Sequence, residues 1–217
     1  MTALFADLHE CLPDGAKLFR DILNPIQQVS ALDLVAEILE EAPPFRPQMP
    51  TGPYMINALS NCGELGWLSD KRGYRYEPTH PATGKPWPPI PAPILKWARK
   101  LTEACGVAPY VPDACLINIY AMDGKLGLHR DFDEADFKWP IVSFSFGNDA
   151  EFLLGGLSRN DRTIKLTLHS GDVLVLGGES RLRYHSVRKI RAGTSPISHQ
   201  CLPAGGRINL TLRRARP

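Results

Sequence analysis

The sequence predicts an α+β protein built on a β-sandwich or jelly roll, with helices that cover one of its sheets. After Asp113 the chain consists of short β-forming runs separated by turn residues, a pattern typical of sandwiches and jelly rolls. Before Asp113, two stretches carry apolar residues at helical spacing. The expected strands are 115–121, 141–146, 151–154, 163–168, 172–176, 183–188 and 207–213.

The N-terminal half contains the two expected helices. Residues 1–29 have the character of short strands and turns. Ser30 and Asp33 fit a capping pattern, so we expect the first helix to begin at Ser30 and to end before Pro43. The second helix is expected over residues 92–104, where the apolar residues form one stripe.

Segment 43–53 is expected to be exposed and semi-rigid, because proline is excluded from the interior of helices and central strands, and segment 78–93 is expected to be a second proline-rich loop. Residues 54–76, between them, have the pattern of strands joined by a loop. We expect one compact domain, in which residues 1–110 support a strand-rich core of residues 111–217.

Composition excludes several classes of protein. The 217 residues carry a net charge of only +2, so no strong overall field draws the chain to nucleic acid or membrane. Three clusters of Lys and Arg, around residues 71–75, 181–191 and 213–216, have solvated loop charge as their simplest explanation. No apolar run approaches the length of a membrane span. The five cysteines are scattered without a C-x-x-C, which indicates a reducing compartment and a soluble, cytoplasmic protein.

The stretch 118–133 ends in His129-Arg130-Asp131. It begins as a strand and passes through a turn at Asp123 and Gly124. If the residues after the turn are also extended, His129 and Asp131 project to the same face. One imidazole and one carboxylate are two of the three ligands of a 2-His-1-carboxylate iron site. An H-x-D by chance is the alternative, so the pattern needs a third ligand.

The expected strand 207–213 alternates polar and apolar residues. Ile208, Leu210 and Leu212 must face a core, which we expect to be the helices. The other face then carries Arg207, Asn209, Thr211 and Arg213 on a buried strand. A buried guanidinium needs an anionic partner, which is either an Asp or Glu of the chain or a carboxylate ligand held by paired hydrogen bonds.

The third metal ligand has three histidine candidates, His169, His185 and His199. His169 lies in a turn sequence and His199 in a polar loop. We choose His185, because the residues around it have strand character. Three ligands on one face of an octahedral ferrous ion leave positions for a bidentate 2-oxo acid and for dioxygen.

The order H-x-D, His185, R-x-N-x-T-x-R resembles the AlkB family. Further motifs share the resemblance, which covers about residues 45–214: N-C-G-x-L-G-W at 61–67, G-Y-x-Y at 73–76, P-D-A-C-L-I-N-x-Y at 112–120, G-D-V at 171–173 and G-G-E-S-R-L at 177–182. Members of this family are Fe(II)- and 2-oxoglutarate-dependent dioxygenases on a double-stranded β-helix, or jelly roll. The resemblance therefore also implies a nucleotide-recognition lid within the N-terminal part.

The resemblance implies a role for each motif residue. The ligands of Fe(II) would be His129, Asp131 and His185. The residues that hold or surround 2-oxoglutarate would be Leu116, Asn118, Tyr120, Leu126, Ser143, Arg207, Asn209 and Arg213, with Arg207 and Tyr120 on one carboxylate. The contacts to the nucleic acid would be Trp67, Tyr74, Asp133 and Arg159, with Trp67 stacked on the target base.

The reaction that the resemblance implies is oxidative demethylation of bases such as 1-methyladenine and 3-methylcytosine in single- or double-stranded DNA, and possibly in RNA. It uses Fe(II), O2 and 2-oxoglutarate, releases succinate, CO2 and formaldehyde, and amounts to direct-reversal DNA repair by a monomeric enzyme. A ring-methylated base is cationic, so an indole face and the carboxylate of Asp133 would both attract it.

Two segments depart from the family pattern. The turn 200–206 before Arg207 is longer than expected, which could shift the register of the arginine strand, although the intact alternation of 207–213 argues for a longer turn only. Segment 43–60 also diverges, so no substrate contact is assigned to it. The competing functions are a 2-oxoglutarate oxygenase of proteins or small molecules, which needs no stacking Trp67, and a non-catalytic jelly-roll binding module.

Overall fold

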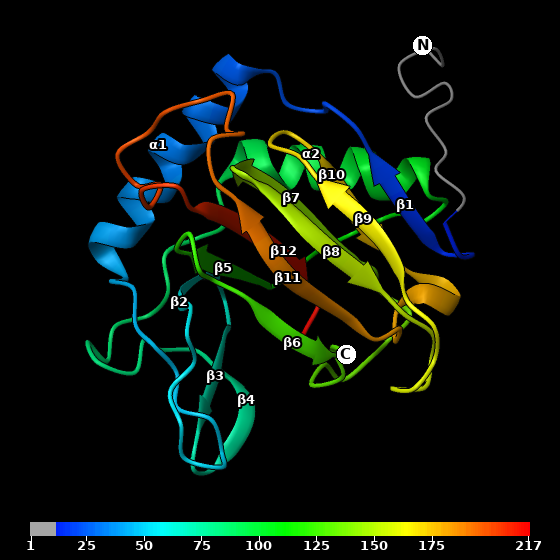
Figure 1. Cartoon of the computed structure of the whole chain (residues 1–217). Helices are drawn as coiled ribbons and strands as arrows, with labels where there is room; N and C mark the ends of the chain where they lie inside the picture. The colour runs from blue at the N-terminus through cyan, green and yellow to red at the C-terminus, as the bar shows by residue number, and fades with distance from the viewer. Residues whose placement is uncertain (1–11) are drawn as a thin grey trace.

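Two facing β-sheets form the centre of the molecule in the computed structural model, which describes residues 12–217 (Figure 1). The larger sheet has the strand order β1-β10-β7-β12-β5-β2 and the smaller sheet the order β6-β11-β8-β9. Neighbouring strands are antiparallel in both sheets. This arrangement confirms the predicted α+β jelly roll.

The strands of the larger sheet are β1 (Ala16–Phe19), β2 (Ala58–Gly63), β5 (Ala114–Tyr120), β7 (Ile141–Gly147), β10 (Val173–Leu176) and β12 (Arg207–Arg213). Those of the smaller sheet are β6 (Leu126–His129), β8 (Asp149–Leu154), β9 (Ile164–Leu168) and β11 (His185–Arg191). A separate hairpin, β3 (Gly66–Asp70) and β4 (Gly73–Glu77), lies at one end of the molecule (Figure 1). The helices are α1 (Pro25–Glu41), α2 (Ala92–Ala104) and the 3-10 turn η1 (Gly178–Ser180).

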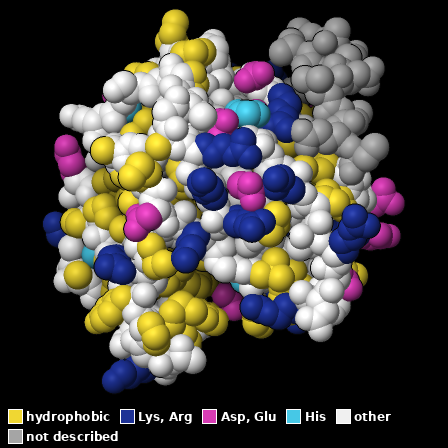
Figure 2. Space-filling view, viewed as in Figure 1, with side chains coloured by type: hydrophobic (Ala, Val, Ile, Leu, Met, Phe, Trp, Pro, Cys, Tyr) yellow, Lys and Arg dark blue, Asp and Glu magenta, His cyan; other side chains and the backbone are white. Residues whose placement is uncertain are grey.

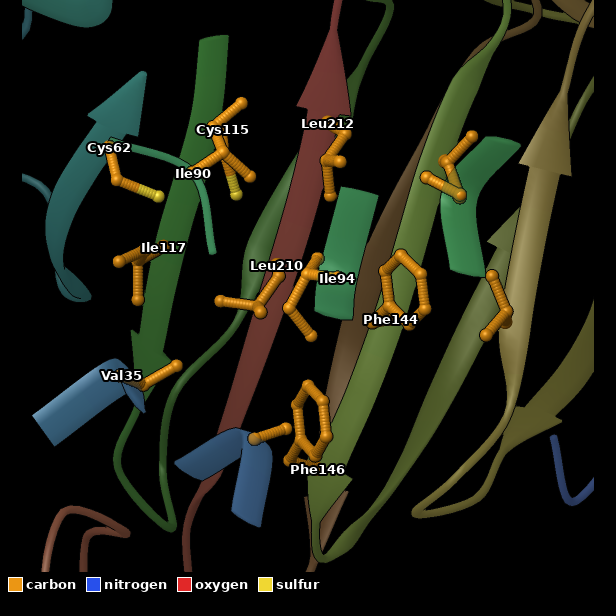
Figure 3. Close-up of a cluster of buried hydrophobic side chains, with 14 of the residues drawn as sticks. Val35, Cys62, Ile90, Ile94, Cys115, Ile117, Phe144, Phe146, Leu210 and Leu212 are labelled. Atoms are coloured by element: carbon orange, nitrogen blue, oxygen red, sulfur yellow. The ribbon is translucent and has the colours of Figure 1, made fainter. Parts of the chain in front are cut away.

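Both α-helices pack on the outer face of the larger sheet, as the apolar face of strand 207–213 predicts. Leu210 and Leu212 of β12 lie in one buried cluster with Val35 of α1 and Ile94 of α2 (Figure 3). A second cluster fills the space between the two sheets and includes Phe152 of β8. None of the helices in the described part of the chain is long and apolar enough to cross a membrane.

Helix α1 begins earlier than predicted. It starts at Pro25 rather than Ser30, and Asn24 is its N-cap. The Asn24 side chain accepts a hydrogen bond from the backbone N–H of Gln27, while the Gln27 side chain accepts one from the backbone N–H of Asn24. Proline suits the first helical position because no intrahelical partner is needed for its missing N–H. Within residues 1–29, the part before residue 12 lies outside the described residues.

Strand β11 is displaced relative to the expected strand 183–188. Residues before His185 form turns after η1, and a register shift between Val187 and Lys189 lets the strand continue to Arg191. The shift is a β-bulge, which places one extra residue on the strand without ending the pairing.

The longer turn before β12 leaves the register unshifted. Arg207 pairs with Tyr120 and the pairing continues without a break to Arg213 and Ala114. The turn is anchored to α1, because His199 Nε2 lies 3.0 Å from Asp33 Oδ1 and Cys201 Sγ donates to the carbonyl of Leu32 at 3.7 Å. The inserted residues are thus absorbed outside the sheet.

Candidate metal centre and adjoining cleft

A cleft of about 870 Å³ opens between the two sheets and is also lined by the β3–β4 hairpin. Three strands of the larger sheet, β5, β7 and β12, contribute polar side chains to its inner wall, including Asn118, Ser143 and Asn209. Apolar residues between them on the same strands, including Ile117, Phe144 and Leu210, face the helices. Because side chains alternate along a strand, the packing of one face fixes which residues enter the cleft.

His129, Asp131 and His185 come together in this cleft as the sequence predicts, with ligand atoms all within 4.8 Å of one another. The Nε2 atoms of the two histidines lie 3.7 Å and 3.5 Å from the two carboxylate oxygens of Asp131. His129 pairs with His185 across β6 and β11. Asp131 lies two residues beyond the end of β6, so strand alternation alone does not place it.

The hydrogen bonds of the two imidazoles orient both rings for metal binding through Nε2. His129 Nδ1 lies 2.8 Å from the carbonyl of Gly127, and His185 Nδ1 lies 3.1 Å from the carbonyl of Arg183. A carbonyl only accepts, so each Nδ1 carries the proton and each Nε2 presents a lone pair to the centre. Desolvation, followed by the charge of His185, lowers the pKa of His129 to about 4. This ring is therefore neutral at pH 7, as metal binding requires.

Asp131 remains ionised although it is buried. Burial raises its pKa, but the Arg213 guanidinium and the hydrogen bond with His185 outweigh this and hold the pKa well below its usual range. Arg213 Nη2 lies 3.1 Å from Asp131 Oδ2. Two imidazoles and one carboxylate on one side of a centre are the donor set of ferrous oxygenases. The residues present thus fit Fe(II).

Arg213 belongs to a buried network that sequence reasoning missed. Glu134, whose side chain is fully buried, accepts hydrogen bonds from Arg213 at 3.0 Å, from Tyr76 at 2.6 Å and from Arg181 at 2.8 Å. Arg181 also donates to the backbone carbonyl of Asp131 at 2.8 Å. The network therefore holds both the backbone and the carboxylate of Asp131. The signal in the sequence was the adjacency of Glu134 to the H-x-D-x-D motif.

Most residues predicted to surround 2-oxoglutarate line the cleft. They are Leu116, Asn118, Tyr120, Leu126, Ser143, Asn209 and Arg213, together with Thr211. Cross-strand pairing arranges them in rows, with Asn118 opposite Asn209, and Leu116 opposite Thr211. Asn209 donates to Ser143 Oγ at 2.8 Å and accepts from Thr211 at 2.8 Å, which fixes its orientation.

Arg207 differs from this set because it does not line the cleft directly. It is 1% exposed and pairs with Tyr120, which does line the cleft. Its guanidinium donates to the carbonyls of Asn148 and Leu168 and to Ser145 Oγ. Within residues 12–217 it has no carboxylate partner in an ion pair, and desolvation lowers its pKa to about 10.

Two buried arginines thus lack either an anionic partner or a full set of hydrogen bonds. Arg207 has only neutral acceptors, and the Nε–H of Arg213 has no hydrogen-bond partner in the described part of the chain. A buried cation without an anion is costly. Of the two explanations for these arginines, pairing with Asp and Glu holds for Arg213, while Arg207 fits an external carboxylate such as that of 2-oxoglutarate.

The four predicted substrate contacts all line the same cleft. Trp67 of β3 stacks on Tyr74 of β4, with ring centroids 5.5 Å apart and an interplanar angle of 19°. Trp67 Nε1 donates to Asp133 Oδ2 at 2.8 Å. Burial raises the pKa of Asp133, and this hydrogen bond opposes the shift. Arg159 donates to the carbonyl of Leu128 in β6, a strand of the smaller sheet, at 2.9 Å.

Sequence reasoning missed the cleft residues of the diverging segment 43–60, which are Met49, Tyr54, Met55, Ile56 and Asn57. Tyr54 is 63% exposed and Ile56 50% exposed. The available signal was large apolar residues in an otherwise exposed loop. Figure 2 shows hydrophobic side chains gathered at the end of the molecule where the β3–β4 hairpin lies in Figure 1.

The basic cluster around residues 181–191 divides in the structure. Arg181 is buried and bonds to Asp131 and Glu134, whereas Arg188 and Arg191 are exposed on β11. Together with Lys165 they surround Glu151, with nitrogen–oxygen distances of 3.5–3.7 Å. Solvated charge explains the exposed members but not Arg181.

Comparisons with known proteins agree with this geometry. Residues 15–213 match the family described as the 2OG-Fe(II) oxygenase superfamily. The chain is 43% identical over 222 residues to the alpha-ketoglutarate-dependent dioxygenase AlkB of Escherichia coli strain K12, covering 99% of this chain and 98% of that protein. It is 36% identical over 143 residues to the mouse nucleic acid dioxygenase ALKBH1, covering 64% of this chain and 35% of that protein.

A solved structure, titled the structure of OsALKBH1, superposes with a TM-score of 0.80 at 31% identity, covering 94% of this chain and 100% of that chain. The fold, the donor set and these similarities agree. The chain belongs to the 2OG-Fe(II) oxygenase superfamily and, within it, to the AlkB family of iron- and 2-oxoglutarate-dependent dioxygenases.

Proposed function

We propose that this enzyme removes methyl groups from alkylated nucleic-acid bases and so repairs DNA by direct reversal. The observation that carries the proposal is the hydrogen-bonded pair Trp67–Asp133, which lies in the same cleft as the three metal-ligating residues. A ring-methylated adenine or cytosine is cationic, and it gains from both an indole face and a nearby carboxylate. The relatives named as nucleic acid dioxygenases support the same class of substrate.

His129, Asp131 and His185 would hold Fe(II), and the two Nδ1–H groups bound to backbone carbonyls keep each Nε2 directed at the metal. When bound, the iron with O2 and 2-oxoglutarate supplies the oxidation of the N-methyl carbon. The hydroxylated methyl group then leaves as formaldehyde, and 2-oxoglutarate becomes succinate and CO2. The chain contributes position and exclusion of water.

The inner face of β5, β7 and β12 would hold 2-oxoglutarate. Arg207 and Tyr120 would contact one carboxylate, since Arg207 is the buried cation without an anionic partner. Burial raises the pKa of Tyr120 to about 12, so its hydroxyl stays protonated and can donate. Asn118, Asn209 and Arg213 would complete the polar wall, while Leu116, Leu126 and Ser143 would shape it.

Trp67 and Tyr74 form the stacking side of the substrate site, Asp133 lies against Trp67, and Arg159 lines the same cleft. The Trp67 indole is positioned by its hydrogen bond to Asp133, so both groups meet the base as one unit. We propose DNA as the main substrate, RNA as a second one, and a monomeric cytoplasmic enzyme. The unpaired state of the four cysteines in the described residues is consistent with a reducing compartment.

The proposed activity is tested by formaldehyde release from matched oligonucleotides. Single- and double-stranded DNA and RNA carrying 1-methyladenine or 3-methylcytosine are incubated with the enzyme, Fe(II), 2-oxoglutarate and O2. We expect formaldehyde and succinate in equal amounts from the methylated strands only. Turnover with none of these substrates, combined with turnover on a methylated peptide or small molecule, would contradict the proposal.

The metal assignment predicts a spectroscopic loss. Replacing His129 by Ala removes one of two neutral nitrogen ligands, so anaerobic Fe(II) plus 2-oxoglutarate should no longer give a charge-transfer absorption band. His169→Ala is the matched control, because the His169 side chain is exposed and, among the described residues, its only hydrogen-bond partner is Asp149 at 2.9 Å. The assignment is wrong if the two variants behave alike.

The cosubstrate assignment predicts a separate effect at Arg207. Arg207→Met removes the buried cation at similar length, so the Kd for 2-oxoglutarate should rise by about 30-fold or more, as expected for truncating one partner of a buried charge pair. Titration of the same absorption band under anaerobic conditions measures it, and a melting curve verifies folding. An unchanged Kd in a folded variant refutes the assignment.

The stacking role predicts a loss at Trp67 that spares the metal. Trp67→Ala should lower kcat/KM on methylated DNA by about 10- to 100-fold, since both stacking and the cation–π attraction are lost. Trp67→Phe keeps an aromatic face and should retain more activity. Both variants should keep the anaerobic absorption band. Undiminished demethylation by Trp67→Ala would remove Trp67 from the substrate site.

A further inference from the structure

Four exposed or half-exposed residues near the metal ligands form a cluster of which the proposed function uses only Arg159. They are Arg130, Phe132, Arg159 and Tyr184, and all four line the cleft. Arg130 and Phe132 flank Asp131, and Tyr184 precedes His185. The Asp131 side chain points toward the two metal-ligating histidines and that of Asp133 toward Trp67. Arg130 and Phe132, which alternate with them, are exposed to solvent. We call these four residues the rim cluster.

Arginines and aromatic rings alternate in the rim cluster. The Arg130 guanidinium lies 5.3 Å from the ring centroid of Phe132 and 5.5 Å from that of Tyr184. The Arg159 guanidinium lies 5.9 Å from the Tyr184 ring. Each separation is within the range of cation–π attraction. The contacts therefore organise the rim without any bound partner.

The rim cluster carries positive charge that no carboxylate neutralises. Neither Arg130 nor Arg159 forms an ion pair within residues 12–217, although other surface arginines such as Arg75 and Arg216 do. Phe132 is 53% exposed, so about half of a large apolar ring faces solvent. Unpaired cations beside an open aromatic face are complementary to a phosphate next to a base.

We propose that the rim cluster binds the nucleotide adjacent to the target base in a single strand, with its base stacked on Phe132 and its phosphate held by Arg130 and Arg159. Stacking on aromatic side chains with nearby arginines is how single-stranded nucleic acid is bound without regard to sequence. In a duplex the neighbouring base is already paired and stacked. The inference rests on the proposed function and deepens it by naming the residues that would meet the nucleotide beside the target base.

The test pairs a protein change with a substrate change. Demethylation is measured on single-stranded oligonucleotides that carry 1-methyladenine and have either a normal base or an abasic site on one side of it. Phe132→Ala should lower kcat/KM about 5- to 150-fold on the normal strand, the range for one stacked base. The loss should disappear when the abasic site is on the side that faces Phe132, and should persist when it is on the other side.

Three variants serve as controls. Phe132→Tyr keeps the ring and should retain activity, whereas Phe132→Leu keeps apolar surface without a ring and should resemble Phe132→Ala. Ile26→Ala removes an apolar side chain that is 78% exposed on α1 and should change nothing. Phe132→Ala must keep the anaerobic absorption band with Fe(II) and 2-oxoglutarate, because Asp131 is its neighbour.

Binding separates this inference from the proposed function. Fluorescence anisotropy of labelled single strands, with and without the abasic site, reports the same coupling when no demethylation occurs. Coupling in binding without turnover supports the rim cluster and contradicts the demethylase. Turnover with equal losses for Phe132→Ala on normal and abasic strands overturns the rim cluster alone. Wild-type enzyme should also favour single over double strands, and Phe132→Ala should narrow that ratio.

Discussion

The ion pair between Asp131 and Arg213 connects the two halves of the site. A carboxylate buried between two imidazoles has to be compensated, and Arg213 does so at 3.1 Å. Arg213 is the last residue of β12, the strand that also carries Asn209 and Arg207. The pairing register of β12 therefore positions both the partner of the metal ligand Asp131 and the cosubstrate wall. Glu134 forms ion pairs with both Arg213 and Arg181, which compensates the charge of Arg213.

The jelly roll stabilises this arrangement because each central strand has one face in the apolar core under the helices and the other face in the cleft. Ile208, Leu210 and Leu212 pack under the helices, and the residues between them are free to be polar. A polar inner face is costly unless every group is bonded. Asn209 is bonded to Ser143, Phe144 and Thr211, so the wall of the cleft is ordered before any ligand enters.

Much of this site was predictable because its signals are local. The alternation in R-I-N-L-T-L-R assigned the faces of β12, which pairs with β5 in unshifted register, and strand character selected His185, which pairs with His129. The start of α1 was missed although Asn24, Pro25 and Gln27 form a complete cap signal, because residues 1–29 were assigned to short strands and turns. The Glu134 network and the cleft contacts of segment 43–60 left only weak signals in the sequence, because they depend on how distant segments pack and no periodicity reports that.

Residues 129–133 unite these functions in one short segment. His129 and Asp131 face the metal position, Asp133 bonds Trp67, and the residues between them face outward. Inward positions are therefore constrained by the chemistry, whereas Arg130 and Phe132 lie at the exposed edge of the cleft, where the proposed rim cluster would meet the flanking nucleotide. A change of substrate form can proceed at these outward positions without disturbing the metal. For the same reason, the composition of the rim is a more direct record of the nucleic acid that this enzyme meets than the metal ligands are.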